Sequence, residues 1–208
     1  MKKLFLFSSV FLLAAIGLKA QSADDILDKV SRNYQKLAAY YIKFEFTDSE
    51  NQKTETGELF AAKEKYNVEV MDIRQMYDGK SLYTISKEDK EVTVSQPSPD
   101  SDDFLSPTKI LNVYKSNFKV SLAKTETVNG KKIKYLKLTP KSKSDIEYAQ
   151  IGIYTDSNTL YNYKEFYPGG GSRSFVVKEY LENLIIPKAL FKFDKSKYEK
   201  DGYIVTPI

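Results

Sequence analysis

Short segments in which apolar and polar residues alternate recur along most of this 208-residue chain, and they constrain its fold more than any other feature. In the first segment, Ile42, Phe44 and Phe46 alternate with polar residues, which places three apolar side chains on one face of a strand. Similar patterns follow at 54–62, 65–72, 74–78, 81–86, 91–96, 118–124, 133–139, 146–154, 160–167 and 173–180. We therefore predict about eleven strands.

Turn-forming residues separate these segments. Asp78-Gly79 joins two of them and predicts a type I′ hairpin, in which both central residues take positive φ. Asn129-Gly130, residues 156–158 and residues 169–171 separate later strands, and residues 97–107, rich in Pro, Asp and Ser, predict a surface loop. After Pro187, which donates no backbone hydrogen bond, Phe191 and Phe193 alternate as expected for a last edge segment.

Two helices are predicted. Residues 22–38 begin with Ser22 and Asp25 at capping-box spacing, and apolar residues then recur at helical intervals. Residues 107–116 begin at Pro107, which suits a first helical turn, and carry Ile110 and Leu111 on one apolar side.

Residues 1–20 are typical of a cleaved secretory signal. Lys2 and Lys3 precede an apolar run over 4–18, and Ala20 precedes Gln21. The run is short for a membrane span, and no Cys follows it that could carry a lipid anchor. We expect an exported, soluble protein whose residues 21–208 form a single domain, located in the periplasm of a bacterium with two membranes.

Composition argues against several classes of function. The formal net charge is +4, and cleavage after residue 20 removes Lys2, Lys3 and Lys19 to leave about +1, too little to predict a nucleic-acid partner. The chain has no His and no Cys, and so lacks the commonest general base, the commonest transition-metal ligand and any disulfide. The residues at 100–103 lack the ligand spacing of a calcium loop. We predict no enzyme activity, no metal and no cofactor.

The strand count leaves two architectures open. A barrel of about eleven strands encloses more space than the interior of an eight-stranded barrel, and two helices are few enough to serve as its plug or lid. A β-sandwich whose aromatic faces pack together fits the alternation equally well.

Five motifs favour the barrel, because in order and spacing they resemble those of the periplasmic lipoprotein carrier family, LolA. They are Tyr77-Asp78-Gly79-Lys80-Ser81-Leu82-Tyr83, Gly57-Glu58-Leu59-Phe60, Ser106-Pro107 with the helix after it, Leu138-Thr139-Pro140-Lys141, and Phe191-Lys192-Phe193. The resemblance implies a mainly β fold: a strongly curved, half-open antiparallel barrel whose helices cover an apolar cavity. It also implies the function of a carrier that receives lipoproteins from an inner-membrane ABC transporter and delivers them to an outer-membrane acceptor or to the membrane itself.

The resemblance also implies a lid contact. Where the family often has Lys-Arg-Pro, with the Arg tying the sheet to a lid helix, this chain has Ala62-Lys63-Glu64. Lys63 is the nearest match, but it lacks the planar donor fork of Arg.

We expect the protein to be a monomer.

Strand parity predicts which residues contact acyl chains, with ordinary core packing as the alternative for each. The predicted set is Ile42, Phe44, Phe46, Leu59, Ala61, Tyr66, Val68, Met76, Leu82, Val94, Ile110, Leu111, Ile151 and Ile153. The lysines between 131 and 143 are interpreted as a solvated strand face, or else as a docking surface for anionic headgroups or an acidic partner.

Two other functions stay open. A sensor of the same fold would bind lipid or lipoprotein without transporting it, although relatives of that kind usually carry a second domain. A carboxylate-based hydrolase would need an acidic pair across a cleft, and no acidic residue lies in an apolar sequence context that would raise its pKa.

Overall fold

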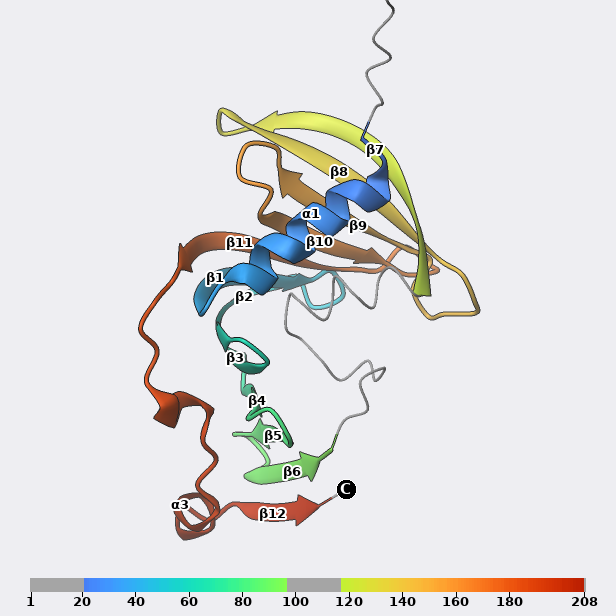
Figure 1. The fold of residues 1–208 in the computed structure, drawn as a ribbon. Helices are drawn as coiled ribbons and strands as arrows, with labels where there is room; N and C mark the ends of the chain where they lie inside the picture. The colour runs from blue at the N-terminus through green and yellow to red at the C-terminus, as the bar shows by residue number, and fades with distance from the viewer. Residues whose placement is uncertain (1–20, 97–116, 208) are drawn as a thin grey trace, which may run out of the picture.

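A computed structural model gives the fold of residues 21–96 and 117–207 (Figure 1). The predicted signal at 1–20, the predicted loop at 97–107 and the predicted helix at 107–116 lie outside the described residues.

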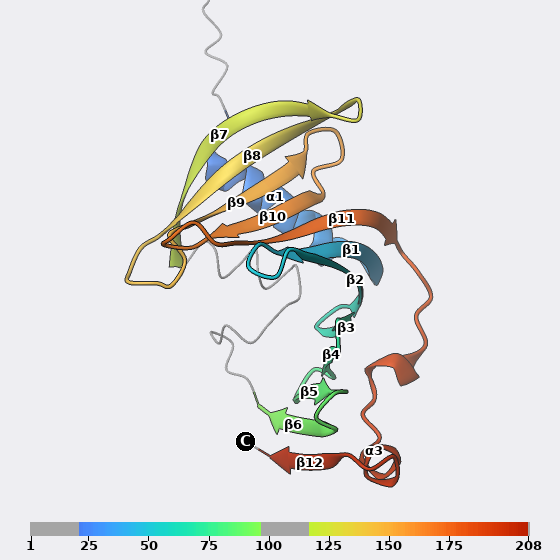
Figure 2. The same cartoon turned by 180° about the vertical axis from the view of Figure 1, so that it is seen from behind.

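One twelve-stranded sheet dominates the described part of the chain. Its strands, in chain order, are β1 (Tyr40–Asp48), β2 (Lys53–Ala62), β3 (Lys65–Val70), β4 (Ile73–Tyr77), β5 (Leu82–Ser86), β6 (Glu91–Ser95), β7 (Phe118–Val128), β8 (Lys131–Pro140), β9 (Tyr148–Tyr154), β10 (Leu160–Phe166), β11 (Ser172–Glu182) and β12 (Ile204–Pro207). Their order across the sheet is β12-β6-β5-β4-β3-β2-β1-β11-β10-β9-β8-β7. Strands β12 and β7 lie at opposite edges of the sheet, so the sheet is open. Figures 1 and 2 show that it is also curved. The predicted mainly β, half-open architecture is confirmed, with one strand more than expected.

Helix α1 (Ala23–Lys36) confirms the first predicted helix. Its capping box is formed as the sequence suggests: the Ser22 hydroxyl accepts from the Asp25 backbone N–H, and the Asp25 carboxylate accepts from the Ser22 N–H, both at 3.1 Å. The buried side chains of α1 include Leu27 and Val30, which belong to the main core cluster with strand residues such as Ile42. We call the sheet face that packs against α1 the inner face and the opposite one the outer face.

The C-terminal segment differs from the prediction. Residues around Phe191 form the 3-10 helix η1 (Lys188–Phe191) instead of an edge strand, and α3 (Lys195–Lys200) follows. The edge strand comes later, as β12, which pairs in parallel with β6. Phe193 stacks on Tyr83 with ring centroids 4.3 Å apart, so its side chain is used for packing against the sheet.

The hairpin between β4 and β5 also differs. Gly79 has φ +98°, while Asp78 does not have positive φ. With Gly at the first of its two central positions, the turn fits type II′, and the predicted type I′ is wrong. The Asp78 carboxylate stabilises the turn by accepting from the backbone N–H groups of Lys80 (2.8 Å) and Ser81 (2.9 Å).

Within the described residues, no helix has the length and apolar character needed to cross a membrane.

Candidate functional site

The candidate site is the inner face, where the strand register aligns apolar residues across the sheet. Phe46 lies opposite Phe175, which lies opposite Tyr163, and the row continues through Ile151 to Leu136. Opposed residues on neighbouring antiparallel strands share a face. An apolar and aromatic strip therefore crosses the five strands β1, β11, β10, β9 and β8.

Helix α1 is tied to the sheet by polar contacts near its C-terminal end. The Asn33 side-chain amide donates to the carbonyl oxygens of Ser157 (3.2 Å) and Asn158 (3.4 Å). The buried Tyr34 hydroxyl accepts from the backbone N–H of Leu160 at 3.3 Å, and burial raises the pKa of Tyr34. These contacts anchor this end of α1 at the turn between β9 and β10.

Ten of the fourteen predicted acyl-contact residues lie together on the inner face. They are Ile42, Phe44, Phe46, Leu59, Ala61, Tyr66, Val68, Leu82, Ile151 and Ile153. All except Phe46, which is half-buried, are at most 6 % exposed. In this conformation they pack against the protein's own atoms, and their contact with acyl chains stays a prediction.

Met76 and Val94 lie on the other face, so their predicted inward orientation is wrong. Met76 is opposite Asn67 and Tyr83, and Val94 is also opposite Tyr83, which places all four on the outer face. The C-terminal segment covers this region, because Asn67 Nδ2 donates to the carbonyl oxygen of Leu190 at 2.6 Å. Met76 is therefore buried in a second, smaller apolar layer.

The remaining predicted residues are not placed at the inner face. Ile110 and Leu111 lie outside the described residues. Lys63 occupies the exposed two-residue turn between β2 and β3, with φ +53°. Among the described residues nothing pairs with its ammonium group, and its lid contact stays a prediction.

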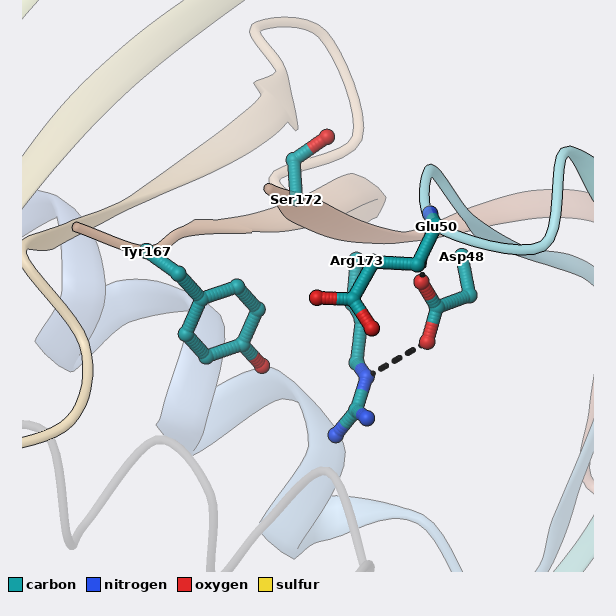
Figure 3. A pocket seen from close by; sticks show the side chains of 5 residues that line it. All are labelled: Asp48, Glu50, Tyr167, Ser172 and Arg173. Carbon is teal, nitrogen blue, oxygen red and sulfur yellow. Dashed lines mark hydrogen bonds and ion pairs between the residues drawn. The ribbon is translucent and has the colours of Figure 1, made fainter. Parts of the chain in front are cut away.

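A polar pocket of about 100 Å³ lies at one end of the inner face (Figure 3). Asp48, Glu50, Tyr167, Ser172 and Arg173 line it. Arg173 Nε donates to Asp48 Oδ2 at 2.9 Å, and the guanidinium carbon lies 5.6 Å from the centre of the Tyr167 ring. Arg173 is paired with Asp48 across the β1–β11 ladder, two residues beyond the Phe46–Phe175 pair, so the apolar strip ends at this charged rim.

Hydrogen bonds and burial shift the pKa values of two rim residues, Asp48 and Tyr167. The backbone N–H of Glu50 and the guanidinium of Arg173 hold the pKa of Asp48 below its ordinary value. The pKa of Tyr167 is raised to about 12, mainly by burial and in addition by the hydrogen bond that its hydroxyl donates to Glu165. Near neutral pH the rim thus combines the Asp48 carboxylate, one guanidinium and a neutral phenol, a set suited to polar contacts. Within residues 21–96 and 117–207, no group of three or more acidic side chains is placed to hold a metal ion.

The inner face also includes three aromatic residues that were not predicted to contact acyl chains. Phe175, Tyr163 and Tyr180 are half-buried and pack against the core cluster. Their positions follow from pairing with β1, since Tyr180 is opposite Ile42 and Phe175 is opposite Phe46. The alternation of residues 173–180 indicates that Phe175 faces inward. The pairing shifts between Lys43 and Phe44, however, which leaves an extra residue in β11, so simple alternation does not place Phe175 and Tyr180 on the same face.

The fold and the site together define a class: an open, curved antiparallel sheet whose apolar inner face packs against an N-terminal helix. No protein-family model matches the chain, and no curated protein matches it either. Among solved structures, it is similar to an uncharacterized conserved protein from Thermus thermophilus, with a TM-score of 0.64 and 11 % identity over 89 % of this chain and 99 % of that one. The two proteins share the fold over nearly their whole lengths.

Two further similar structures have lower scores. One is a LolA superfamily protein from Nitrosomonas europaea, with a TM-score of 0.41 and 10 % identity over 84 % of this chain and 99 % of that one. The other is the Mycobacterium tuberculosis lipoprotein LppX, with a TM-score of 0.48 and 14 % identity over 79 % of this chain and 97 % of that one.

Proposed function

We propose that the protein is a periplasmic carrier that binds the acyl chains of lipoproteins on its inner face. The observation that carries this proposal is the gathering of ten predicted contact residues on one face of a sheet that is not closed. The five sequence motifs that resemble the lipoprotein carrier family support it further. Binding, not catalysis, is the proposed activity, and no cofactor takes part.

Energetics support the need for a carrier. Each buried methylene contributes about 0.8 kcal/mol, so one chain of about fifteen methylenes is held out of water by roughly 12 kcal/mol. A lipoprotein released from one membrane therefore cannot cross an aqueous compartment at a useful rate without a protein that covers its chains.

Acyl chains can bind the inner face only if they replace the contacts that α1 makes there, because this face is already packed. Ile26, Leu27, Val30 and Tyr34 of α1 are each at most 3 % exposed. Exposing a buried apolar side chain costs about 1.5–3 kcal/mol, so lifting these four costs roughly 6–12 kcal/mol by the same measure. One acyl chain offsets that cost, which makes displacement of α1 energetically accessible.

The proposed route runs from an inner-membrane ABC transporter, as donor, to the outer membrane or an acceptor lipoprotein. The signal-like residues 1–20 support export to the periplasm.

Two matched substitutions test the binding face. Phe46 and Phe60 are half-buried phenylalanines on neighbouring strands, but Phe46 points to the inner face while Phe60 packs against Tyr41 on the outer face, with ring centroids 4.8 Å apart. After co-expression with a lipoprotein-releasing transporter, wild-type protein and Phe60→Asp are expected to co-purify with acylated lipoproteins, detected by mass spectrometry, and Phe46→Asp is not.

Absence of lipid and lipoprotein from the wild type would contradict the proposal, and equal loading of the two folded variants would show that the inner face is not the site.

Depletion of the protein from cells distinguishes a transport function from a sensor function. Loss of a carrier strands lipoproteins at the inner membrane, whereas loss of a sensor leaves their distribution unchanged.

A further inference from the structure

The outer face of β7 to β10 carries a concentration of positive charge. Lys137 alternates with Leu136 and Leu138, which point inward, so its side chain points outward. The strand positions of this face contain Lys119, Lys124, Lys131, Lys137 and Lys164. Within these four described strands Glu126, which pairs with Lys124, is the acidic residue on this face. Figure 2 shows the face turned toward the viewer, with α1 behind the sheet.

Aromatic rings hold four of these ammonium groups in place. The Nζ-to-centroid distances are 5.5 Å for Lys124 over Tyr135, 5.1 Å for Lys131 over Tyr154, 4.4 Å for Lys137 over Tyr148 and 5.0 Å for Lys164 over Phe166. Such contacts attract the cation to the ring face without neutralising its charge. The lysines of β7, β8 and β10 therefore form an ordered array on rings that belong to β8, β9 and β10.

Lysines interleaved with tyrosine and phenylalanine match the chemistry of an anionic bilayer surface. Polybasic surfaces are attracted to anionic headgroups, and here the rings beneath the lysines hold the ammonium groups at the surface. The array is a local feature, because the whole chain has a formal net charge of only +4.

Single-stranded nucleic acid is a poorer fit. Binding of that kind uses open aromatic faces on which bases stack. Here the rings are covered: Tyr148 and Phe166 stack on each other at 4.4 Å, Tyr154 packs edge-on against Tyr161 at 5.3 Å, and each of the four cation-bearing rings is capped by its lysine.

We propose that the outer face of β7 to β10 is an electrostatic docking surface for anionic lipid bilayers. This inference does not depend on acyl-chain binding, because it uses the opposite face of the sheet. A protein docked in this way keeps its sheet between the membrane and α1, so the helix stays free to move while the protein is at the membrane.

Vesicle flotation tests the proposal with two variants of equal net charge. The test variant carries Lys→Gln at positions 124, 131, 137 and 164, and the control carries Lys→Gln at exposed positions 188, 192, 197 and 200 of the C-terminal segment. Wild-type protein is expected to float with phosphatidylcholine vesicles that contain phosphatidylglycerol, and not with phosphatidylcholine alone. Each lysine near the surface contributes roughly fivefold to the affinity, so the test variant is expected to bind several hundredfold more weakly. The control is expected to bind as the wild type does.

A third variant with Lys→Arg at the four test positions keeps the charge and is expected to restore binding, which separates loss of charge from loss of fold. Raising the salt concentration is expected to release the wild type, because screening weakens exposed charges. Equal binding to both vesicle types, or equal losses in test and control variants, would overturn the proposal. Displacement from the vesicles by single-stranded DNA at matched phosphate concentration would reassign the face to polyanions in general.

Discussion

Shortening one side chain of α1 is expected to destabilise the empty protein and to strengthen its binding of acyl chains. Leu27 is fully buried in the core cluster between α1 and the inner face. A Leu→Ala change at such a site costs about 2–5 kcal/mol, because the surrounding atoms fill the vacated space only in part. At about 2–4 °C per kcal/mol for a chain of this size, Leu27→Ala is expected to lower the Tm by about 4–20 °C.

The effect on binding has the opposite sign if acyl chains replace the contacts of α1. In the loaded state Leu27 no longer packs on the inner face, so the substitution destabilises the empty protein more than the loaded protein. The binding free energy then becomes more favourable by up to the stability lost, and about 1.4 kcal/mol corresponds to a tenfold change. We expect the affinity for a fluorescent fatty acid to rise by at least about tenfold.

Ile85→Ala is the matched control. Ile85 is 1 % exposed and lies on the outer face of β5, so its removal costs comparable stability but affects the empty and loaded states equally. Titration of the probe into the three purified proteins, with Tm measured on the same samples, separates the two effects. If the affinity of Leu27→Ala equals that of Ile85→Ala, α1 stays in place during loading and the exchange of contacts is refuted.

Two further predictions concern the sheet and its charged rim. Gly152→Ala would place a Cβ 2.2 Å from Asn162 Oδ1, so it is expected to destabilise the protein by about 1–3 kcal/mol. The urea midpoint is then expected to fall at constant m-value. An unchanged midpoint would show that the Asn162 side chain moves away without cost. The pKa of Tyr167 is raised from 10.0 to about 12, so its contribution to stability is complete below pH 10 and is lost as the pH rises toward 12. Tyr167→Phe is therefore expected to make the Tm fall less steeply with pH over this range, and parallel curves for variant and wild type would contradict the assignment.

The sequence predicted the inner face well where one side of a strand is consistently more apolar than the other. Along β1, Ile42 and Phe44 alternate with the charged residues Lys43 and Glu45. The side-chain period of two then leaves a single choice of face. The same reasoning located Ile151, since its neighbours in β9 include Gln150 and Gly152.

Parity failed at β4 and β6 because the outer face of this region is also apolar and packs beneath the C-terminal segment. Met76 and Tyr77 are adjacent apolar residues on opposite faces: Tyr77 is opposite Tyr66 on the inner face, while Met76 joins the outer layer beneath the C-terminal segment. In β4 apolar residues therefore occur on both faces, whereas in β6 Val92 and Val94 alternate regularly with Thr93 and Ser95 but lie on the outer face. The covering segment lies more than a hundred residues further along the chain, and local patterns contain no information about such a contact.

The C-terminal segment was misread for a related reason. Phe191 and Phe193 have the spacing of a strand, but Phe191 ends a 3-10 helix and Phe193 is stacked between Tyr83 and Tyr198, with centroid distances of 4.3 and 5.0 Å. Aromatic packing at long range overrides the weak preference of so short a segment. The parallel strand β12 was not predicted, because four residues provide too little alternation to identify a strand.

A packed inner face suits a protein that must release what it binds. Three acyl chains of about fifteen methylenes would contribute roughly 36 kcal/mol if they entered a preformed apolar trough, which is well above the practical ceiling of about 18–21 kcal/mol for noncovalent binding. An open trough of that size would also promote aggregation of the empty protein. Side chains of α1 such as Leu27 and Val30 cover the face in the absence of ligand, and the free energy needed to displace them is subtracted from the binding free energy. For the proposed carrier, the burial that makes the empty protein stable would thus also lower its affinity to a range in which an acceptor can compete for the lipid.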